Sequence, residues 1–199
     1  MRTTRVSLLL RVKDASDGNA WDEFHDLYAP LLYNYARSRG LSSADAEEIR
    51  DQCLEVVARK ITDFEYDRAK GGFKCWLYRI ASYKIIDMLR KSREKRADTR
   101  VLRSLRSPEP SPDELWEKHW RNEHLKFCVQ QARASVSEQS YRAFHMLLFD
   151  GCSVTDVGEA LGLNANQVYK AKSRVLQRIR EVLDQLGTSD GVVATQLGL

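Results

Sequence analysis

Three of the four prolines in this chain fall within five residues, in the segment Ser107-Pro-Glu-Pro-Ser-Pro112. Proline removes a backbone hydrogen bond and clashes with the preceding helical turn, so no helix runs through this segment. A chain of 199 residues has room for two small domains. The prolines therefore predict a stiff linker over residues 104–112, between a first domain at 1–103 and a second at 113–187. The small, weakly apolar residues 188–199 are expected to form a flexible tail.

Apolar residues recur at helical spacing nearly throughout, without a convincing period-two strand, so we predict an all-α protein of two small helical domains. Asp17 is expected to cap the second helix, which has a kink near Pro30. Ser42 or Ser43 is expected to cap the third, with Glu47 completing a capping box. The predicted helices span residues 6–12, 17–40, 43–60, 73–95, 113–134, 138–149, 154–161 and 165–186.

Composition excludes several classes of protein. No apolar run has the length of a membrane span, and Arg11 and Lys13 end the N-terminal apolar stretch too early for a signal peptide, so we expect a cytoplasmic protein. The four cysteines lie far apart without a CxxC pair, which favours reduced, mostly buried thiols. His124 and Cys128 have helical i, i+4 spacing, but no further ligands are evident. We therefore expect no metal and no cofactor.

Charge is distributed unevenly along the chain. The stretch 74–106 holds eleven Lys or Arg against three acids, and 165–180 holds five basic residues and no acid. Five acids and one Arg lie between positions 45 and 55. Two separate basic segments and one acidic helix indicate two contacts with a polyanion and one with a basic partner.

The stretch 154–168 has the pattern of a helix-turn-helix. Gly158 is expected to let the second helix cross closely, and Gly162 to take the left-handed turn position. Leu163 should fill the corner, and Asn164 is placed to cap the second helix. The residues predicted to form the core are Val157, Leu161, Val168, Ala171 and Val175.

The other face of this second helix carries side chains suited to DNA. Asn, Gln and Arg can read base edges through paired hydrogen bonds, whereas Lys and Ser suit phosphates. An ordinary helical hairpin with a solvated basic face explains the apolar pattern but neither the glycines nor the absence of acids, so DNA binding is favoured. The candidate residues are Asn166, Gln167, Tyr169, Lys170, Ser173, Arg174 and, farther along, Gln177.

The helix predicted from Phe73 combines a core stripe with aromatic and basic residues. Phe73, Trp76, Leu77, Ile80, Ala81 and Met88 share one face, and Arg79, Tyr83, Asp87 and Arg90 a neighbouring one. Aromatics interleaved with basic residues suit single-stranded DNA, where bases stack and phosphates need counter-charge. Core packing is the favoured role for Trp76.

Glu48, Asp51, Gln52 and Glu55 cluster on one surface of the third helix. An acidic helix face of this kind is commonly just exposed to solvent and has no partner. Beside a DNA-binding helix, however, uncompensated acids would repel phosphate, so a basic protein partner explains them better.

Two blocks, Phe73-Lys-Cys-Trp-Leu-Tyr-Arg-Ile-Ala with Ile86-Asp-Met-Leu-Arg90, and the helix-turn-helix continuing into Arg174–Leu183, resemble the extracytoplasmic-function group of bacterial sigma factors. The resemblance covers roughly residues 5–186. It implies a sigma factor that docks on core RNA polymerase through Glu48, Asp51, Gln52 and Glu55, and that reads the promoter −35 element through the 165–180 helix. It also implies that the 63–72 loop and the 73–96 helix open and hold the −10 element. The −10 candidates are Tyr66, Lys74, Arg79, Tyr83, Lys84, Arg90, Lys91 and Arg93.

The chain departs from the family pattern at three places. Glu48-Ile-Arg-Asp-Gln52 stands where the family has Asp-Leu-Val-Gln-Glu, so Arg50 replaces an apolar residue. Tyr83 stands where Asn is usual, which bears on −10 specificity. Val136-Ser137 replaces Leu-Pro. Acid and amide character survive in the first of these segments, so polymerase binding is still expected.

The partners implied are core polymerase and promoter DNA, and the resemblance leaves an anti-sigma factor open. The main alternative is a stand-alone helix-turn-helix regulator of duplex DNA, which normally dimerises; no heptad seam is present, so we expect a monomer when free. A nuclease or ligase would need clustered carboxylates or histidines that bind metals, or a phosphate loop. The four histidines are scattered and no GxxxxGK(S/T) motif occurs. We therefore expect no enzymatic activity.

Overall fold

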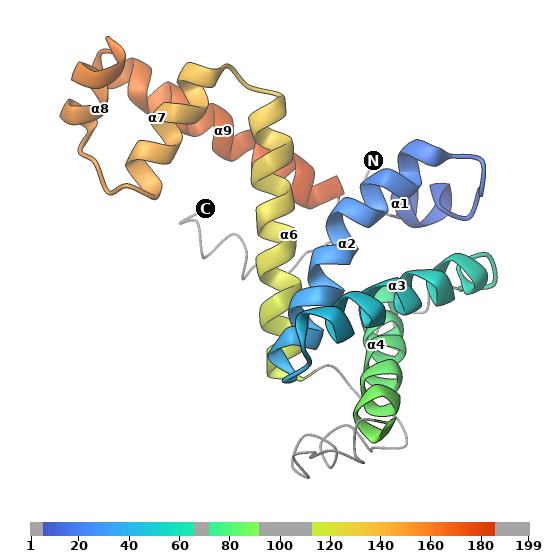
Figure 1. The fold of residues 1–199 in the computed structure, drawn as a ribbon. Helices are drawn as coiled ribbons and strands as arrows, with labels where there is room; N and C mark the ends of the chain where they lie inside the picture. Colours follow the sequence, from blue (N-terminus) through green and yellow to red (C-terminus); the bar gives the residue numbers. More distant parts are fainter. Residues whose placement is uncertain (1–5, 66–71, 92–112, 186–199) are drawn as a thin grey trace. The chain divides into compact units, whose positions relative to one another are not determined.

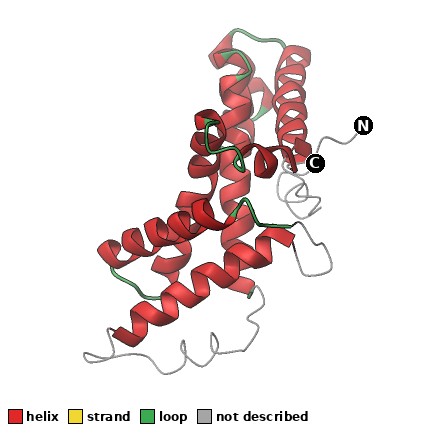
Figure 2. Ribbon diagram, turned by 90° about the vertical axis from the view of Figure 1, so that its right-hand side faces the viewer, coloured by secondary structure: helices red, strands yellow, loops and turns green. Residues whose placement is uncertain are grey.

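A computed structural model describes residues 6–65, 72–91 and 113–185, drawn in colour in Figure 1. These residues form eight α-helices and no strand (Figure 2), which confirms the predicted all-helical class. Among them, no helix combines the length and apolar character needed to cross a membrane. They divide into two compact units, one within Ser7–Glu123 and the other from His124 onward.

The bounds of the helices agree closely with those predicted from the sequence. The helices are α1 (Val6–Arg11), α2 (Gly18–Ser38), α3 (Ser43–Lys60), α4 (Gly72–Lys91), α6 (Glu114–Ala134), α7 (Glu138–Leu148), α8 (Val154–Leu161) and α9 (Ala165–Gln185). Pro30 lies inside α2, which continues to Ser38. The predicted linker 104–112, the tail 188–199 and the extension of the fourth helix to residue 95 lie outside the described residues.

Side-chain caps fix the starts of two helices. The Asp17 carboxylate accepts a hydrogen bond from the Ala20 N–H at 2.9 Å, as predicted. Ser42 Oγ accepts from the Asp45 N–H at 3.1 Å and donates to the Asp45 carboxylate at 2.7 Å. The prediction that Glu47 completes this capping arrangement is wrong, because the third residue after the cap is Asp45.

In the unit within Ser7–Glu123, α2 packs against α3 and α4, and α3 packs against α4. Its largest fully buried side chains include Phe24, Leu27, Leu31, Leu32, Ile49, Leu77 and Ile85. The first half of α6 belongs to the same unit. The Trp116 ring, fully buried, lies 4.9 Å from the Tyr35 ring and 5.4 Å from the Tyr78 ring. Helices distant in sequence thus share one aromatic core.

Asp113, directly before α6, joins three helices of this unit. Its Oδ1 accepts from the Trp116 N–H at 2.8 Å and so caps α6. Its Oδ2 accepts from the hydroxyls of Tyr35 at 3.2 Å and Tyr78 at 3.1 Å, and also pairs with the Arg39 guanidinium. One carboxylate therefore ties the start of α6 to both α2 and α4.

The second unit contains α7, α8 and α9, each in contact with the other two. Its core includes the buried side chains of Ala143, Val157, Val168 and Ala171. Leu161 and Leu163 are partly buried against this cluster, in agreement with the predicted pattern. At the start of α7, Gln139 donates to the Leu161 carbonyl at 3.1 Å, which ties α7 to the end of α8.

Candidate nucleic-acid interface

The turn between α8 and α9 has the backbone geometry of a helix-turn-helix. Gly162 ends α8 in the left-handed conformation, at φ 65° and ψ 36°, which side chains with a β-carbon disfavour. A β-carbon on Gly158 would lie 2.6 Å from the Leu163 carbonyl oxygen. Gly158 is therefore needed for a close approach, as predicted, but the neighbour is the backbone of the turn and not the second helix.

Reciprocal caps begin both helices of the motif. At α8, Ser153 Oγ accepts from the Asp156 N–H and the Asp156 carboxylate accepts from the Ser153 N–H. At α9, Asn164 Oδ1 accepts from the Gln167 N–H at 2.9 Å, and Gln167 Oε1 accepts from the Asn164 N–H at 2.8 Å. The predicted cap at Asn164 is confirmed, and the side-chain amide oxygen of Gln167 takes part in it.

The burial pattern of α9 separates a core face from an exposed one. Val168, Val175 and Ile179 are fully buried. All of the residues singled out from the sequence are exposed: Asn166, Gln167, Tyr169, Lys170, Ser173, Arg174 and Gln177. Tyr169 is 59% exposed, a high value for a large aromatic ring. The guanidinium of Arg174 lies 3.5 Å from Ser140 Oγ, at the limit of hydrogen bonding.

The buried face of α4 differs from the predicted core stripe. Phe73, Leu77, Tyr78, Ala81, Ser82 and Ile85 are buried, whereas Trp76, Ile80 and Met88 are only half-buried, so those three were wrongly assigned to the core. The helix is rotated toward Asp113, to which the Tyr78 hydroxyl donates. The hydrogen-bonding side chain of Tyr78 is therefore buried in the core, where the apolar pattern predicted Ile80 and Met88.

The predicted −10 residues of α4 fall into distinct environments. Tyr83 is 54% exposed, Arg90 and Lys91 are exposed, and Arg79 and Lys84 are half-buried. The Asp87 carboxylate lies 2.7 Å from Arg90 and 3.0 Å from Lys91, and these partners, Lys91 foremost, lower its pKa. Lys74 points to α6 instead, with its ammonium 3.0 Å from the Glu117 carboxylate. Tyr66 and Arg93 lie outside the described residues.

A surface cavity of about 520 Å³ lies where the end of α3 and the residues after it meet the start of α4. This volume is within the range of about 300–1,000 Å³ typical of sites for small ligands. The rings of Phe64 and Trp76, 4.9 Å apart, form part of its lining. Arg79 Nε is buried there without a hydrogen-bond acceptor among the described residues. The other lining residues are Lys60, Asp63, Glu65 and Gly72.

The cavity was not foreseen from the sequence. Trp76 was assigned to the core, and Phe64 was not singled out at all. The feature of the sequence that could have indicated the cavity is Phe64, an aromatic residue in the loop before a helix rich in basic and aromatic residues. The cavity combines two aromatic rings with two cations, Lys60 and Arg79, and two carboxylates, Asp63 and Glu65. Such a lining can accept a flat ligand with hydrogen-bond donors and acceptors, such as an unstacked base.

The acidic residues of α3 share a face, as predicted. Glu48, Asp51 and Glu55 are exposed and Gln52 is half-buried, while Ile49 and Cys53 on the opposite side are fully buried. Gln52 donates to Glu48 at 2.8 Å, which links one turn to the next.

Basic residues of α3 partly neutralise this acidic face. The Arg50 side chain lies 2.7 Å from the Asp51 carboxylate and lowers the pKa of that carboxyl group. Glu55 and Arg59 approach to 3.6 Å. The chain's departure at Arg50 therefore adds a cation to the rim of the acidic face instead of an apolar contact to the core.

The cysteines carry no disulfide. Cys53 and Cys128 are buried and Cys75 and Cys152 half-buried. Burial raises the pKa of the Cys53 thiol to about 12, which keeps it protonated and unreactive at neutral pH. No group of three or more potential metal ligands occurs in the described part of the chain.

Comparison with known proteins agrees with this geometry. Residues 24–95 match the sigma-70 region 2 family. The chain is 24% identical over 166 residues to the ECF RNA polymerase sigma factor SigE of Mycolicibacterium smegmatis, covering 82% of this chain and 62% of that protein. It is 24% identical over 180 residues to the ECF RNA polymerase sigma factor RpoE of Cereibacter sphaeroides, covering 89% of this chain and 96% of the relative. The resemblance to the extracytoplasmic-function group of sigma factors is confirmed.

Proposed function

We propose that this chain is a transcription initiation factor of the extracytoplasmic-function sigma group, which binds core RNA polymerase, recognises the −35 and −10 promoter elements and promotes DNA opening. The observation that carries the proposal is the exposed face of α9 in a helix-turn-helix, free of acids from 165 to 180, on a chain whose residues 24–95 match sigma-70 region 2. A sigma factor needs both a duplex-reading element and a domain that engages polymerase and the opened strand.

In this proposal, the exposed face of α9 enters the major groove at the −35 element. Asn166 and Arg174 are exposed and can each form paired hydrogen bonds to a base edge. Lys170, one turn from each, is suited to a phosphate because its ammonium acts as a point charge. Tyr169 and Ser173 extend the same surface.

The −10 element is assigned to α4 and the cavity at its start. Exposed Tyr83 offers a stacking surface beside Arg90 and Lys91, which supply counter-charge to the backbone. The cavity between Phe64, Trp76 and Arg79 would receive an unstacked base. Arg79 Nε, which has no hydrogen-bond acceptor in the part of the chain that the structure describes, supports an oxygen-bearing ligand at this place. Tyr66 and Arg93 remain proposed members of this surface. Lys74 is also proposed as a member, although its ion pair with Glu117 competes with a contact to DNA.

Docking on core polymerase is assigned to the acidic face of α3, formed by Glu48, Asp51, Gln52 and Glu55. Exposed carboxylates attract a basic partner, and this attraction weakens with salt because charges are screened within about 10 Å at ~0.1 M. Core polymerase and promoter DNA are thus the proposed partners. The protein is proposed to act in the cytoplasm, as a monomer when free, and without enzymatic activity or cofactor.

The proposal is tested by reconstitution of the purified chain with core polymerase and selection from a promoter library with a randomised −35 element. Arg174→Ala or Asn166→Ala should flatten one column of the selected sequence, at a cost of about 1–3 kcal/mol. Lys170→Ala should weaken all sequences equally and reduce the salt slope by about one unit. If the chain directs no specific start site on core polymerase but still selects duplex DNA alone, it is a stand-alone regulator and the proposal is wrong.

A further inference from the structure

Lys13, in the turn between α1 and α2, reaches across the first unit to the residues that follow α3. Its ammonium donates to the Phe64 carbonyl at 2.6 Å and to the Thr62 carbonyl at 3.3 Å. These residues lie directly after Ile61, which caps the C-terminus of α3. A cation is favoured there because the helix dipole places partial negative charge at this end.

The backbone that Lys13 holds carries a wall of the cavity. The Phe64 ring packs 4.9 Å from the Trp76 ring and 5.7 Å from the Phe73 ring, and both Phe64 and Trp76 line the cavity. The Phe64 N–H donates to the Ile61 carbonyl at 3.2 Å, which makes a turn, and the hydrogen bond from Lys13 fixes the other side of the same residue. Lys13 thus holds the backbone from which the Phe64 ring extends.

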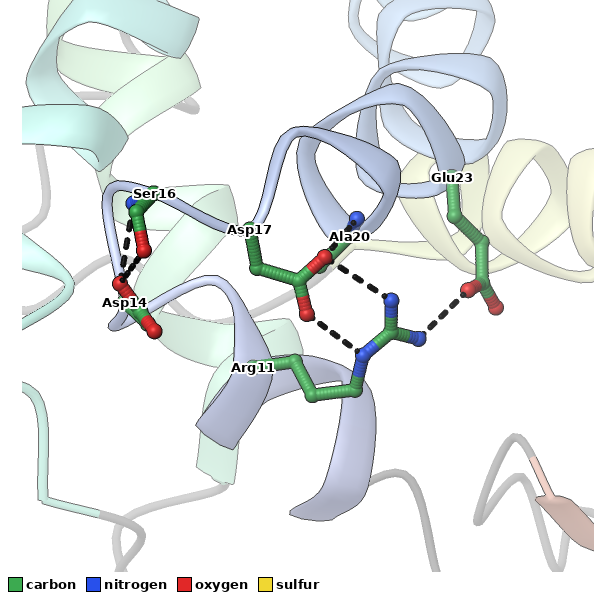
Figure 3. Close-up of polar contacts among 6 residues, drawn as sticks. All are labelled: Arg11, Asp14, Ser16, Asp17, Ala20 and Glu23. Atoms are coloured by element: carbon green, nitrogen blue, oxygen red, sulfur yellow. Dashed lines mark hydrogen bonds and ion pairs between the residues drawn. The ribbon is translucent and has the colours of Figure 1, made fainter.

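The turn that presents Lys13 is itself fixed on both sides (Figure 3). Arg11 makes two bonds to the Asp17 carboxylate, at 2.9 and 3.2 Å, and one to Glu23 at 3.2 Å. The Asp14 carboxylate accepts from the N–H and hydroxyl of Ser16 at 2.9 and 2.6 Å. A lysine on a pre-organised turn loses less conformational entropy when it binds, so its two acceptors are held more firmly.

We propose that Lys13 is a positioning residue for promoter opening: by holding the carbonyls of Thr62 and Phe64, it sets the shape of the cavity that receives the unstacked −10 base. This inference rests on the proposed function, because it assigns the cavity to the −10 strand. It adds the turn between α1 and α2 to the machinery of opening, without contact between Lys13 and DNA.

The test compares Lys13→Met, which keeps the length of the side chain without its donors, with Lys13→Arg, which keeps donors and charge. Lys118→Met, on an exposed position of α6, is the control for loss of one positive charge. Each full-length variant is combined with core polymerase. Four quantities are measured: thermal midpoint, core association, −35 duplex binding, and the rate of −10 opening from permanganate reactivity of thymines.

Lys13→Met should slow opening by about fivefold to tenfold, the scale of the net contribution of a typical intramolecular hydrogen bond. Its core association and −35 binding should equal those of the control, and Lys13→Arg should recover most of the opening rate. Equal opening in Lys13→Met and the control would overturn the inference. A parallel decline of all four quantities, or no recovery with Lys13→Arg, would also overturn it, since Lys13 would then serve stability alone.

Two further variants separate this inference from the function on which it rests. Arg79→Ala and Tyr83→Ala remove side chains assigned to the −10 strand itself. If both open the promoter at the normal rate, the −10 assignment fails, and the role of Lys13 fails with it. If both are slow while Lys13→Met is normal, the −10 assignment stands and only the inference about Lys13 is overturned.

Discussion

Replacement of Asp113 by alanine should destabilise the unit within Ser7–Glu123 more than any other single carboxylate deletion at its surface. The carboxylate caps α6, accepts from two tyrosine hydroxyls and pairs with Arg39, whose side chain is only 12% exposed. Loss of a helix cap costs about 1 kcal/mol. Loss of one partner of a buried ion pair costs about 3–5 kcal/mol, and the 32% exposure of the Asp113 side chain places this pair below that range.

With the tyrosine bonds included, and because contributions that share one group do not add fully, Asp113→Ala should cost about 3 kcal/mol. For a unit of this size that corresponds to a fall in melting temperature of about 12 °C. Asp113→Asn should lose about half as much, since its amide oxygen can still cap α6. Its NH2 group, however, would face the donors of Arg39 and of the tyrosines.

Tryptophan fluorescence is a selective assay for this prediction. All four tryptophans, Trp21, Trp76, Trp116 and Trp120, belong to the unit within Ser7–Glu123. Thermal unfolding of the full-length chain followed by their emission therefore reports this unit and not the helix-turn-helix. Glu114→Ala, at an exposed neighbouring position, is the matched control. A transition of Asp113→Ala within about 1 kcal/mol of this control would refute the reasoning, because a single surface carboxylate commonly contributes that little.

Three further predictions follow from the contacts described. Gly158→Ala should destabilise the helix-turn-helix by a net of about 1–2 kcal/mol, because overpacking of the new β-carbon against the backbone exceeds the ~1 kcal/mol gain in helix propensity. Gly162→Asn should cost less, because asparagine tolerates a left-handed φ. Hydrogen exchange of the α8 and α9 amides measures both variants. Charge reversal at Asp51 and Glu55 should weaken association with core polymerase in a salt-dependent way while helical content by circular dichroism stays constant. The pKa of Asp17 lies below its ordinary 3.8, because the carboxylate accepts hydrogen bonds from the side chain of Arg11 and from a backbone N–H. The stabilising contribution of Asp17 is therefore complete at pH values above 3.8 and is lost as the pH falls through the lowered pKa. The NMR shift of the carboxyl carbon would follow this titration.

The charge reversal has a matched control within the chain, and each of the three predictions has an outcome that would contradict it. The control is Asp22 with Asp26, two exposed carboxylates on α2 that give the same change in net charge. Equal weakening in both pairs would mean that net charge, and not the acidic face of α3, governs association. For the glycines, a Gly158→Ala variant as stable as the parent would show that the turn can move away from the added β-carbon. An Asp17 carboxyl group that titrates at or above 3.8 would show that the bond from Arg11 is absent in solution.

Sequence alone determined the features that neighbouring residues decide. Helical spacing of apolar residues located the helices, and Asp17, Asn164 and Gly162 marked helix ends because their partners lie within a few positions. The exposed face of α9 was also predictable, since a 3.6-residue repeat fixes which side chains oppose a buried stripe. The error at Glu47 was one of spacing, because Glu47 lies five residues after Ser42 and four after Ser43, whereas a capping box needs the third residue, which is Asp45 for the observed cap Ser42.

The tertiary structure alone decided what depends on partners far apart in the chain. Asp113 bonds to Tyr78 across 35 positions and to Tyr35 across 78, and these bonds place the first half of α6 with α2 and α4 although the prolines suggested a break before it. Lys13 meets Phe64 across 51 positions. No periodicity encodes such pairs, because a polar side chain is compatible with solvent at any surface position, and only packing shows which acceptor it finds. The rotation of α4, which leaves Trp76 half-exposed at the cavity, accompanies the bond from Tyr78 to Asp113.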